Sequence, residues 1–233
     1  MEDYPNPVTK QCTQKILDQM NKNFIYKINV TEEKFLIGFF CKIKNKNKKI
    51  PVMIINNYIL YEENKDTINV SINNEMKKIK FGNTRYLNKE FNISMIDIKE
   101  DKDIDINYLE IDSNISGKDS DLKYYKESIY IIQPYNENEA SVSYGKINNI
   151  TKSQLIYNGN LNSNSHGLPI FNLSNNKIIG IHNNKSKYYN KGIFLRYMIN
   201  EFNKIFHNEI EIIIDIKEKY INKKIFFLDI IFI

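Results

Sequence analysis

Three histidines are the side chains of this 233-residue chain best suited to acid–base or metal chemistry at neutral pH. His166 lies within the run Asn164–Ile170, His182 ends the apolar run Ile178–His182, and His207 follows a stretch with helical periodicity. Two imidazoles without a third ligand make a poor metal site, because zinc centres take three or four protein ligands. We therefore expect neither a metal nor a cofactor at His166 and His182, and we expect His207 to be exposed to solvent.

The composition is typical of a globular chain, with 42% apolar residues, 26% charged residues and a mean hydropathy of −0.49. The net charge is +5, and the one basic cluster, Lys42–Lys49, contains neither arginine nor aromatic residues. Nucleic-acid-binding surfaces usually have both, so we expect no nucleic-acid partner. Cys12 and Cys41 form neither a disulfide framework nor a CxxC metal motif. Because Met1–Val8 does not resemble a signal peptide and apolar runs are short, we expect an intracellular protein without a membrane span.

Short strands must position the histidines. Most of the chain consists of segments rich in Ile, Val, Tyr and Phe that are bounded by Asn, Gly, Lys or Asp. Their close, regular spacing predicts an all-β barrel or sandwich. The expected strands are Phe24–Val30, Phe35–Ile43, Val52–Leu60, Thr67–Ile72, Ile93–Ile98, Ser128–Gln133, Ala140–Ile147, Ile170–Leu173 and Lys177–His182.

Apolar residues recur at helical spacing in Thr9–Asn21 and in about Phe194–Phe206, which predicts a short N-terminal helix and a C-terminal helix. The polar, acid-rich stretch Lys99–Lys123 divides the strands into two halves, so we expect two barrels joined by a linker. The chain is thus expected to have three parts. These are residues 1–105 with the N-terminal helix and first barrel, residues 106–207 with the linker, second barrel and C-terminal helix, and residues 208–233 as a short β tail.

Four segments, in order along the chain, resemble those of the trypsin-like (chymotrypsin-fold) serine peptidases. Phe35–Cys41 is similar to the family's Gly-x-Gly-Phe strand, and Pro51–Leu60 resembles its "P-V-L-I-T-N-N-H-V-L", which carries the catalytic histidine. Phe91–Ile98 is similar to the strand that follows the triad aspartate. Asn164–Ile170, followed by Ile178–His182, looks like the nucleophile loop and the strand that lines the specificity pocket.

The resemblance covers about residues 10 to 205 and implies a double β-barrel with its active site in the cleft between the barrels. All three triad positions differ from the family, however. Tyr58 stands where the family has its catalytic histidine, Asn92 where it has aspartate, and His166 where it has the serine nucleophile. Asn164 replaces the glycine two residues before the nucleophile, so Asn164 and His166 occupy the oxyanion-hole positions.

These replacements remove the chemistry of the triad, in which an imidazole takes the proton of serine and a carboxylate orients that imidazole. A phenol such as that of Tyr58, with an ordinary pKa near 10, is ionised only to about one part in a thousand at pH 7. The amide of Asn92 carries no charge, and attack by His166 would give an unstable acyl-imidazole. Ser165 is adjacent to the nucleophile position in a tight turn and aims elsewhere. Asp97 lies on the opposite strand face from Asn92.

The resemblance also places His182 and Gly180 in the specificity pocket, where peptidases that prefer Glu or Gln carry a histidine. The alternative for His182 is a histidine satisfied at a strand end. We predict a protein that retains the peptidase scaffold, lacks catalysis and binds a peptide or protein in the cleft between the barrels. Two other functions stay open, an active serine-type endopeptidase that uses unrecognised groups and a structural or regulatory module.

Overall fold

The computed structural model describes residues 5–20, 25–29, 35–46, 48–56, 66–72, 75–117, 120–134, 140–161, 165–186 and 188–206. Tyr58, Asn164, His207 and the expected tail of residues 208–233 lie outside these ranges.

The first half of the described chain folds into a seven-stranded sheet with the order β1-β4-β5-β6-β3-β2-β7. A further pairing of β1 with β2 closes six of these strands into a ring, and β7 adds to β2 in parallel. The strands are β1 (Tyr26–Asn29), β2 (Phe35–Asn45), β3 (Lys48–Ile55), β4 (Thr67–Ile72), β5 (Glu75–Asn88), β6 (Ile93–Lys99) and β7 (Tyr108–Leu109).

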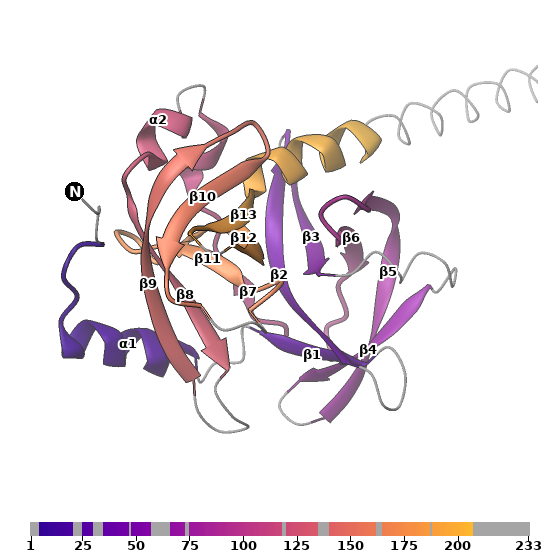
Figure 1. The fold of residues 1–233 in the computed structure, drawn as a ribbon. Helices are drawn as coiled ribbons and strands as arrows, with labels where there is room; N and C mark the ends of the chain where they lie inside the picture. Colours follow the sequence, from indigo (N-terminus) through magenta and orange to yellow (C-terminus); the bar gives the residue numbers. More distant parts are fainter. Residues whose placement is uncertain are drawn as a thin grey trace, which may run out of the picture.

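The second half forms a closed barrel with the order β10-β13-β12-β11-β8-β9. Its strands are β8 (Ser128–Pro134), β9 (Ala140–Ile150), β10 (Gln154–Gly159), β11 (Pro169–Asn172), β12 (Ile178–Lys185) and β13 (Asn190–Phe194). The helix α1 (Lys10–Met20) lies beside β9, whereas the C-terminal helix, residues 195–206, runs along the junction of the two barrels (Figure 1). The stretch between the sheets contains β7, a 3₁₀ helix η2 (Ser113–Ser116) and a short helix α2 (Ser120–Tyr124).

The predicted all-β double barrel with a helix near each end is confirmed, and a strand lies within or overlaps each expected segment. The structure adds three longer strands that the sequence pattern does not indicate, β5, β10 and β13. In β5 a register shift between Phe81 and Arg85 interrupts the alternation of buried and exposed residues. In β13 Gly192 looks like a turn residue. It is required by packing instead, because a Cβ there would lie 2.4 Å from Cδ1 of Ile170.

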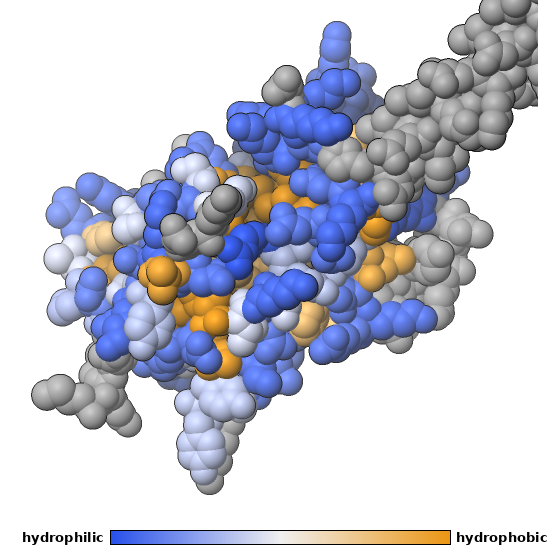
Figure 2. All heavy atoms as spheres, turned by 90° about the horizontal axis from the view of Figure 1, so that it is seen from above, coloured by the Kyte–Doolittle hydropathy of each residue, from blue (hydrophilic) through white to orange (hydrophobic). Residues whose placement is uncertain are grey.

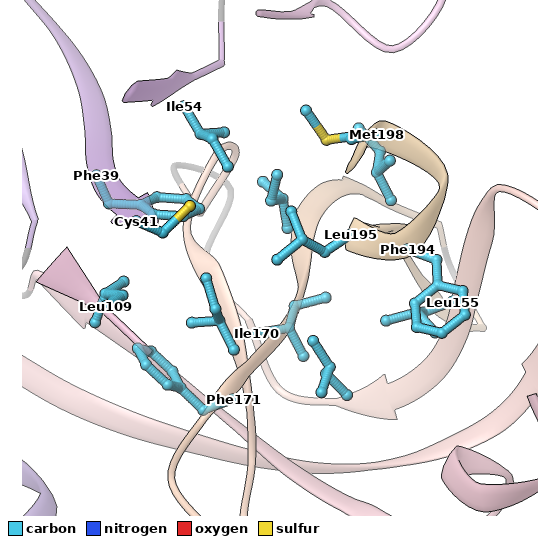
Figure 3. Packing of buried hydrophobic residues seen from close by; sticks show 14 of the residues in the cluster. Phe39, Cys41, Ile54, Leu109, Leu155, Ile170, Phe171, Phe194, Leu195 and Met198 are labelled. Atoms are coloured by element: carbon cyan, nitrogen blue, oxygen red, sulfur yellow. The ribbon is translucent and has the colours of Figure 1, made fainter. Parts of the chain in front are cut away.

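The two barrels share one hydrophobic core. Strand β2 is buried on both faces, so that Phe40 points into the first barrel whereas Phe39 and Cys41 join the cluster shared with the second. Figure 3 shows side chains of β2 and β3 meeting those of the second barrel and of the C-terminal helix, such as Leu195 and Met198. Burial of each phenylalanine or leucine contributes about 1.5–3 kcal/mol. The shared core therefore fixes how the barrels lie relative to each other.

The outer surface is mainly polar. Seen from above, hydrophilic side chains cover most of the face, and hydrophobic residues appear as smaller areas between them (Figure 2). The most exposed large hydrophobic side chains in the described ranges are Tyr188, at 79%, and Leu122, at 76%. The helices that the structure describes are all too short or too polar to cross a bilayer.

A buried carboxylate attaches the inter-barrel stretch to the second barrel. Asp112 is fully buried, and its oxygens accept hydrogen bonds from the backbone N–H of Asn114 (3.0 Å), Nδ2 of Asn175 (2.9 Å) and Nδ2 of Asn172 (3.2 Å). Its own N–H donates to the carbonyl of Ile178 at 3.1 Å. Burial raises the pKa of Asp112, but the hydrogen bonds from Asn175, Asn114 and Asn172 outweigh it and leave this pKa below its ordinary value.

We expect Asp112→Asn to lower the free energy of unfolding at pH 7 by about 1–3 kcal/mol, because an amide would set one N–H group against these donors. A carboxyl group whose pKa is lower in the folded state stabilises the fold above its unfolded pKa of about 3.9, and that contribution is lost as the pH falls through the folded value. Urea unfolding at several pH values should therefore give curves for wild type and variant that converge at acidic pH.

Glu110→Gln is the matched control for Asp112→Asn. Glu110 is 76% exposed and its carboxylate lies 3.0 Å from Nζ of Lys177, so its loss should cost less than about 0.5 kcal/mol. Equal effects of the two substitutions would contradict the role given to Asp112.

Candidate functional site

Three segments that are distant in sequence come together between the barrels. Ile55, the last residue of β3, pairs with Ser94 of β6, which places Asn92 of the β5–β6 turn beside the end of β3. The loop before β11 approaches the same place, because a Cβ on Gly167 would lie only 2.4 Å from Cβ of Asn56. The structure thus brings the backbone next to Asn92 and His166 to the end of β3, three residues before Tyr58 in sequence.

The turn at Asn92 has a backbone suited to asparagine. Asn92 has a φ of 50°, in the left-handed region, and asparagine adopts this region more readily than most residues. Its N–H donates to the carbonyl of Lys89 at 3.3 Å, and its side chain is exposed. The residue at the family's aspartate position is therefore an exposed, uncharged amide.

His166 is exposed in a loop that is fixed to β12. The N–H of Gly167 donates to the carbonyl of His182, and the N–H of His182 donates to the carbonyl of Leu168, both at 2.8 Å. Gly167 has a φ of 83°, which favours glycine in this turn. The ring centroids of His166 and His182 are 5.7 Å apart, with an interplanar angle of 32°. The two sequence-predicted histidines are therefore neighbours.

Ser165 and Asp97 lie close in sequence to triad positions, but neither side chain faces the end of β3. Ser165 is 1% exposed, and its hydroxyl donates to Oε1 of Gln133 at 2.7 Å, so it points into the second barrel. Asp97 pairs with Val52 in the middle of β3, and its Oδ1 accepts the N–H of Thr84 at 2.8 Å. A buried serine and a carboxylate at the β5 bulge cannot replace a nucleophile and a base orienter at the end of β3.

His182 is buried and held by a tyrosine. It is 1% exposed, and its Nδ1 lies 2.6 Å from the hydroxyl oxygen of Tyr157 on β10, which is equally buried. Burial lowers the pKa of His182 to about 4, with smaller contributions from His166 and Lys185. Burial also raises the pKa of Tyr157 well above its ordinary value, so the phenol keeps its proton.

The direction of this hydrogen bond follows from the chemistry of the two groups. A buried hydroxyl proton needs an acceptor, and Nδ1 of neutral His182 is the acceptor within reach of the Tyr157 hydroxyl. Tyr157 therefore donates to Nδ1, and the ring proton of His182 resides on Nε2. In the described part of the chain, only Nδ1 of this ring has a hydrogen-bond partner.

Gly180, the other predicted pocket residue, lies two positions before His182 on β12 and faces the interior of the barrel. A Cβ there would lie 2.6 Å from Cδ1 of Leu155 and 2.8 Å from the carbonyl oxygen of Ile193. Glycine is thus required by close strand packing beneath His182. Sequence reasoning missed Tyr157, the partner of His182, because β10 was not an expected strand, although the alternation of Leu155 and Tyr157 is a weak signal for β10.

The described residues contain no group of three or more His, Cys, Asp or Glu side chains placed to hold a metal. Two hollows of the surface lie elsewhere. One of about 560 Å³ is bordered by the C-terminal helix and includes Arg196 and Lys204, and one of about 510 Å³ lies along residues 100–108.

Comparison with known proteins establishes the fold. No protein-family model and no curated protein matches this chain, whereas 234 chains of solved structures do. Deg5 matches with a TM-score of 0.54 and 13% identity over 83% of this chain and 94% of that one. The serine endoprotease from Yersinia pestis matches with a TM-score of 0.56 and 12% identity, covering 87% of this chain and 68% of that one.

A third match is an inactive serine-to-alanine mutant of Rv3671c from M. tuberculosis H37Rv, with a TM-score of 0.55 and 8% identity over 87% of this chain and 96% of that one. At such low identity the likeness concerns the fold alone. The chain has the double-barrel fold of the trypsin-like, chymotrypsin-fold serine proteases.

We expect His182 to stay neutral in the folded protein down to about pH 5, because its pKa is about 4 and that of an unfolded histidine is about 6.5. The unfolded chain then binds the proton first, so stability is complete above pH 6.5 and falls by about 3 kcal/mol as the pH decreases to 4. NMR titration of the His182 ring, together with urea unfolding between pH 8 and pH 4, measures both quantities.

His182→Gln should remove the loss of stability between pH 6.5 and 4, whereas His166→Gln, at the exposed neighbouring ring, should retain it. A His182 ring that titrates near pH 6.5 in the folded protein would contradict its burial against Tyr157.

Proposed function

We propose that this protein is a catalytically inactive member of the trypsin-like serine protease fold, a pseudopeptidase that binds an extended peptide or protein segment between its barrels. In this proposal Tyr58, Asn92 and His166 occupy the triad positions, Asn164 and His166 the oxyanion-hole positions, and His182 with Gly180 the specificity pocket. The observation that carries the proposal is the pair His166 and His182, with rings 5.7 Å apart and the inner ring already bonded to Tyr157.

The histidine pair argues against hydrolysis. A nucleophile needs a neighbour that accepts its proton at neutral pH. The ring against His166 is His182, whose Nδ1 accepts from Tyr157 and whose pKa of about 4 makes it a very weak base. Asn92 supplies no charge to stabilise an imidazolium. The residues at these positions therefore cannot generate the attacking anion of the serine protease mechanism.

The same geometry supports binding. Docking of an extended peptide on this fold depends on strand edges and side-chain pockets, which do not require the triad. His182 offers the N–H of Nε2, and its burial keeps this donor in a fixed direction because Tyr157 holds the opposite nitrogen. A side chain with a carbonyl or carboxylate oxygen, such as Gln or Glu, is the class of ligand that such a donor would bind.

We expect no hydrolysis when the purified protein is incubated with a mixed peptide library, and no labelling by a serine-directed phosphonate probe. Mass spectrometry measures both. Cleavage that persists in His166→Ala would reveal catalytic groups elsewhere, as in the alternative of an active endopeptidase. Cleavage that this substitution abolishes would give His166 a direct role. Either result would overturn the proposal.

A restored triad provides the positive control for the phosphonate experiment. The variant with Tyr58→His, Asn92→Asp, Asn164→Gly and His166→Ser is expected to acquire phosphonate labelling, because base, orienter and nucleophile then occupy the positions inferred from the resemblance. The same variant without Tyr58→His should label much more slowly. Equal labelling of the two would show that these positions do not act together.

We expect peptides that end in Gln or Glu to bind the protein and to lose about fivefold in affinity on His182→Ala, since a hydrogen bond within a buried site contributes about 1 kcal/mol. Fluorescence anisotropy with labelled peptides measures the affinity. Tyr125→Ala, at a half-exposed aromatic directly after α2, is the control and should leave binding unchanged. Equal affinity of wild type and His182→Ala would remove His182 from the binding site.

If no peptide binds, the remaining alternative is a structural or regulatory module, for which the segment 208–233 is the part to delete. Aggregation or an altered oligomeric state after this deletion would then support that role, and an unaltered monomer would count against it.

A further inference from the structure

Most strands of the second barrel come from a long stretch of chain without a carboxylate. Residues 140–200 include six lysines and one arginine but no aspartate or glutamate, whereas residues 97–139 include twelve acidic residues and five lysines. At the average composition of the chain, about seven acidic residues would be expected in 140–200. Strands β9 to β13 all lie in this stretch, so none of them contributes a negative charge to the surface.

The turn between β12 and β13 presents two tyrosines between lysines of this stretch. Tyr188 is 79% exposed and Tyr189 is 39% exposed. Nζ of Lys191 lies 5.7 Å from the ring centroid of Tyr189, and Lys185, just before the turn, is exposed. Neither lysine forms an ion pair with a carboxylate of the described residues. Exposed rings and positive charge without a counter-charge therefore occur together at this turn.

One serine fixes the backbone of both tyrosines. Oγ of Ser186 accepts the N–H of Tyr188 at 3.3 Å and the N–H of Tyr189 at 3.1 Å. The N–H of Ser186 donates to the carbonyl of Tyr189 at 2.8 Å. Because these hydrogen bonds already order the turn, little conformational entropy is lost when a ligand contacts the two rings.

Strand alternation directs Tyr189 and Lys191 to the outer surface of the barrel. Asn190, which lies between them in sequence, is 2% exposed and faces the interior, opposite Tyr157. Successive residues of an extended chain point to opposite faces, so the two side chains that flank Asn190 point outwards. The contact between the Lys191 ammonium and the Tyr189 ring agrees with this direction.

The same outer surface continues across β10 to β9. Asn158 follows the inward-facing Tyr157 and therefore faces outwards, and its partner in the β9–β10 pairing is Lys146, whose N–H donates to Oδ1 of Asn158 at 2.8 Å. Strands β9 and β13 are both neighbours of β10, so Lys146 and Lys191 are separated by two strand spacings, about 10 Å across the sheet. We name this area the outer basic surface, and its members are Lys146, Asn158, Lys185, Tyr188, Tyr189 and Lys191.

The outer basic surface has the composition of a site for single-stranded nucleic acid. Proteins that bind single strands combine positive charge, which tracks the phosphates, with aromatic rings on which successive bases stack. Here three lysines supply the charge and two tyrosines supply the rings. The cluster Lys42–Lys49 has the charge without the rings.

We propose that the outer basic surface binds single-stranded nucleic acid, with bases stacked on Tyr188 and Tyr189 and with phosphates held by Lys146, Lys185 and Lys191. The inference goes beyond the proposed function and uses none of the residues assigned to it. It also replaces the expectation, drawn from Lys42–Lys49, that the chain has no nucleic-acid partner.

Two other anionic partners fit this surface less well. A protein segment that lies on a membrane inserts apolar side chains such as Trp, Phe or Leu into the lipid, and the described residues of this turn are polar apart from the tyrosines. An acidic peptide would pair with the lysines, but its carboxylates would leave the two rings without a planar group to stack on. A nucleic acid strand carries both the charge and the planar groups.

The test compares four labelled or vesicle-borne anions at low salt: an oligouridylate of twelve nucleotides, an abasic strand of the same length, a polyglutamate of equal charge, and vesicles of phosphatidylcholine with phosphatidylserine. The abasic strand keeps the phosphates and lacks the bases, so it isolates stacking without changing the protein. Fluorescence anisotropy and vesicle sedimentation should give the tightest binding for the oligouridylate, with a loss of at least about tenfold for the abasic strand.

Tyr188→Ala should weaken binding of the oligouridylate about fivefold or more and leave binding of the abasic strand unchanged. Tyr125→Ala is the matched control, because Tyr125 is 50% exposed and has Nζ of Lys126 5.7 Å from its ring centroid but lies outside the outer basic surface. This control should bind both strands like the wild type.

Lys191→Gln should lower the slope of log affinity against log salt concentration by about 0.7, the value for one phosphate contact with a single strand. Lys44→Gln removes the same charge from the exposed β2–β3 hairpin and should leave this slope unchanged. Circular dichroism checks that the variants are folded.

Equal affinities of the wild-type protein for the oligouridylate and the abasic strand would overturn the proposal, because the tyrosines would then not stack on bases. Tighter binding of polyglutamate or of the vesicles would overturn it in favour of an acidic protein or a membrane. Failure of the oligouridylate to bind would overturn it outright, and none of these results would affect the proposed binding of peptides.

Discussion

The position of one proton governs the chemistry of the proposed site. Tyr157 and His182 come from β10 and β12, which do not pair with each other and are connected through β13. Closure of the second barrel therefore brings the phenol to the imidazole, and the resulting 2.6 Å hydrogen bond determines which ring nitrogen carries the proton. The backbone of His182 also fixes the loop that carries His166. Barrel closure, ring orientation and loop position are consequently one coupled arrangement.

The strands could be predicted where the sequence alternates clearly or forms continuous apolar runs, as in Phe35–Ile43 and Ser128–Gln133. The family-like segments also led to Asn92, His166 and His182, which the structure describes. Prediction failed at β10 and β13, where a short strand contains Asn and Gly for reasons of packing between strands. Such reasons are absent from local periodicity, so Tyr157 and Asn190 emerged only when the register of the barrel was known.

The interior of the second barrel differs from an ordinary hydrophobic core at one end. Leu155 and Ile170 fill the middle, whereas Tyr157, His182 and Asn190 replace apolar residues toward the His166 loop. Polar side chains in such a place weaken the fold unless each finds a partner. The hydroxyl of Tyr157 has its acceptor in Nδ1 of His182, whereas Oδ1 of Asn190 has no partner among the described residues.

Because both faces of β2 are buried, the two halves of the molecule cannot be separated into two independent polypeptides. Phe39 and Cys41 face the second barrel from a strand whose opposite side, at Phe40, completes the first. A fragment that ended in the connecting stretch would present this apolar face to water, with Ile54 of β3 beside it. Truncation of the gene there would yield half-molecules with an exposed apolar face and a tendency to aggregate, so one barrel cannot simply be exchanged for another.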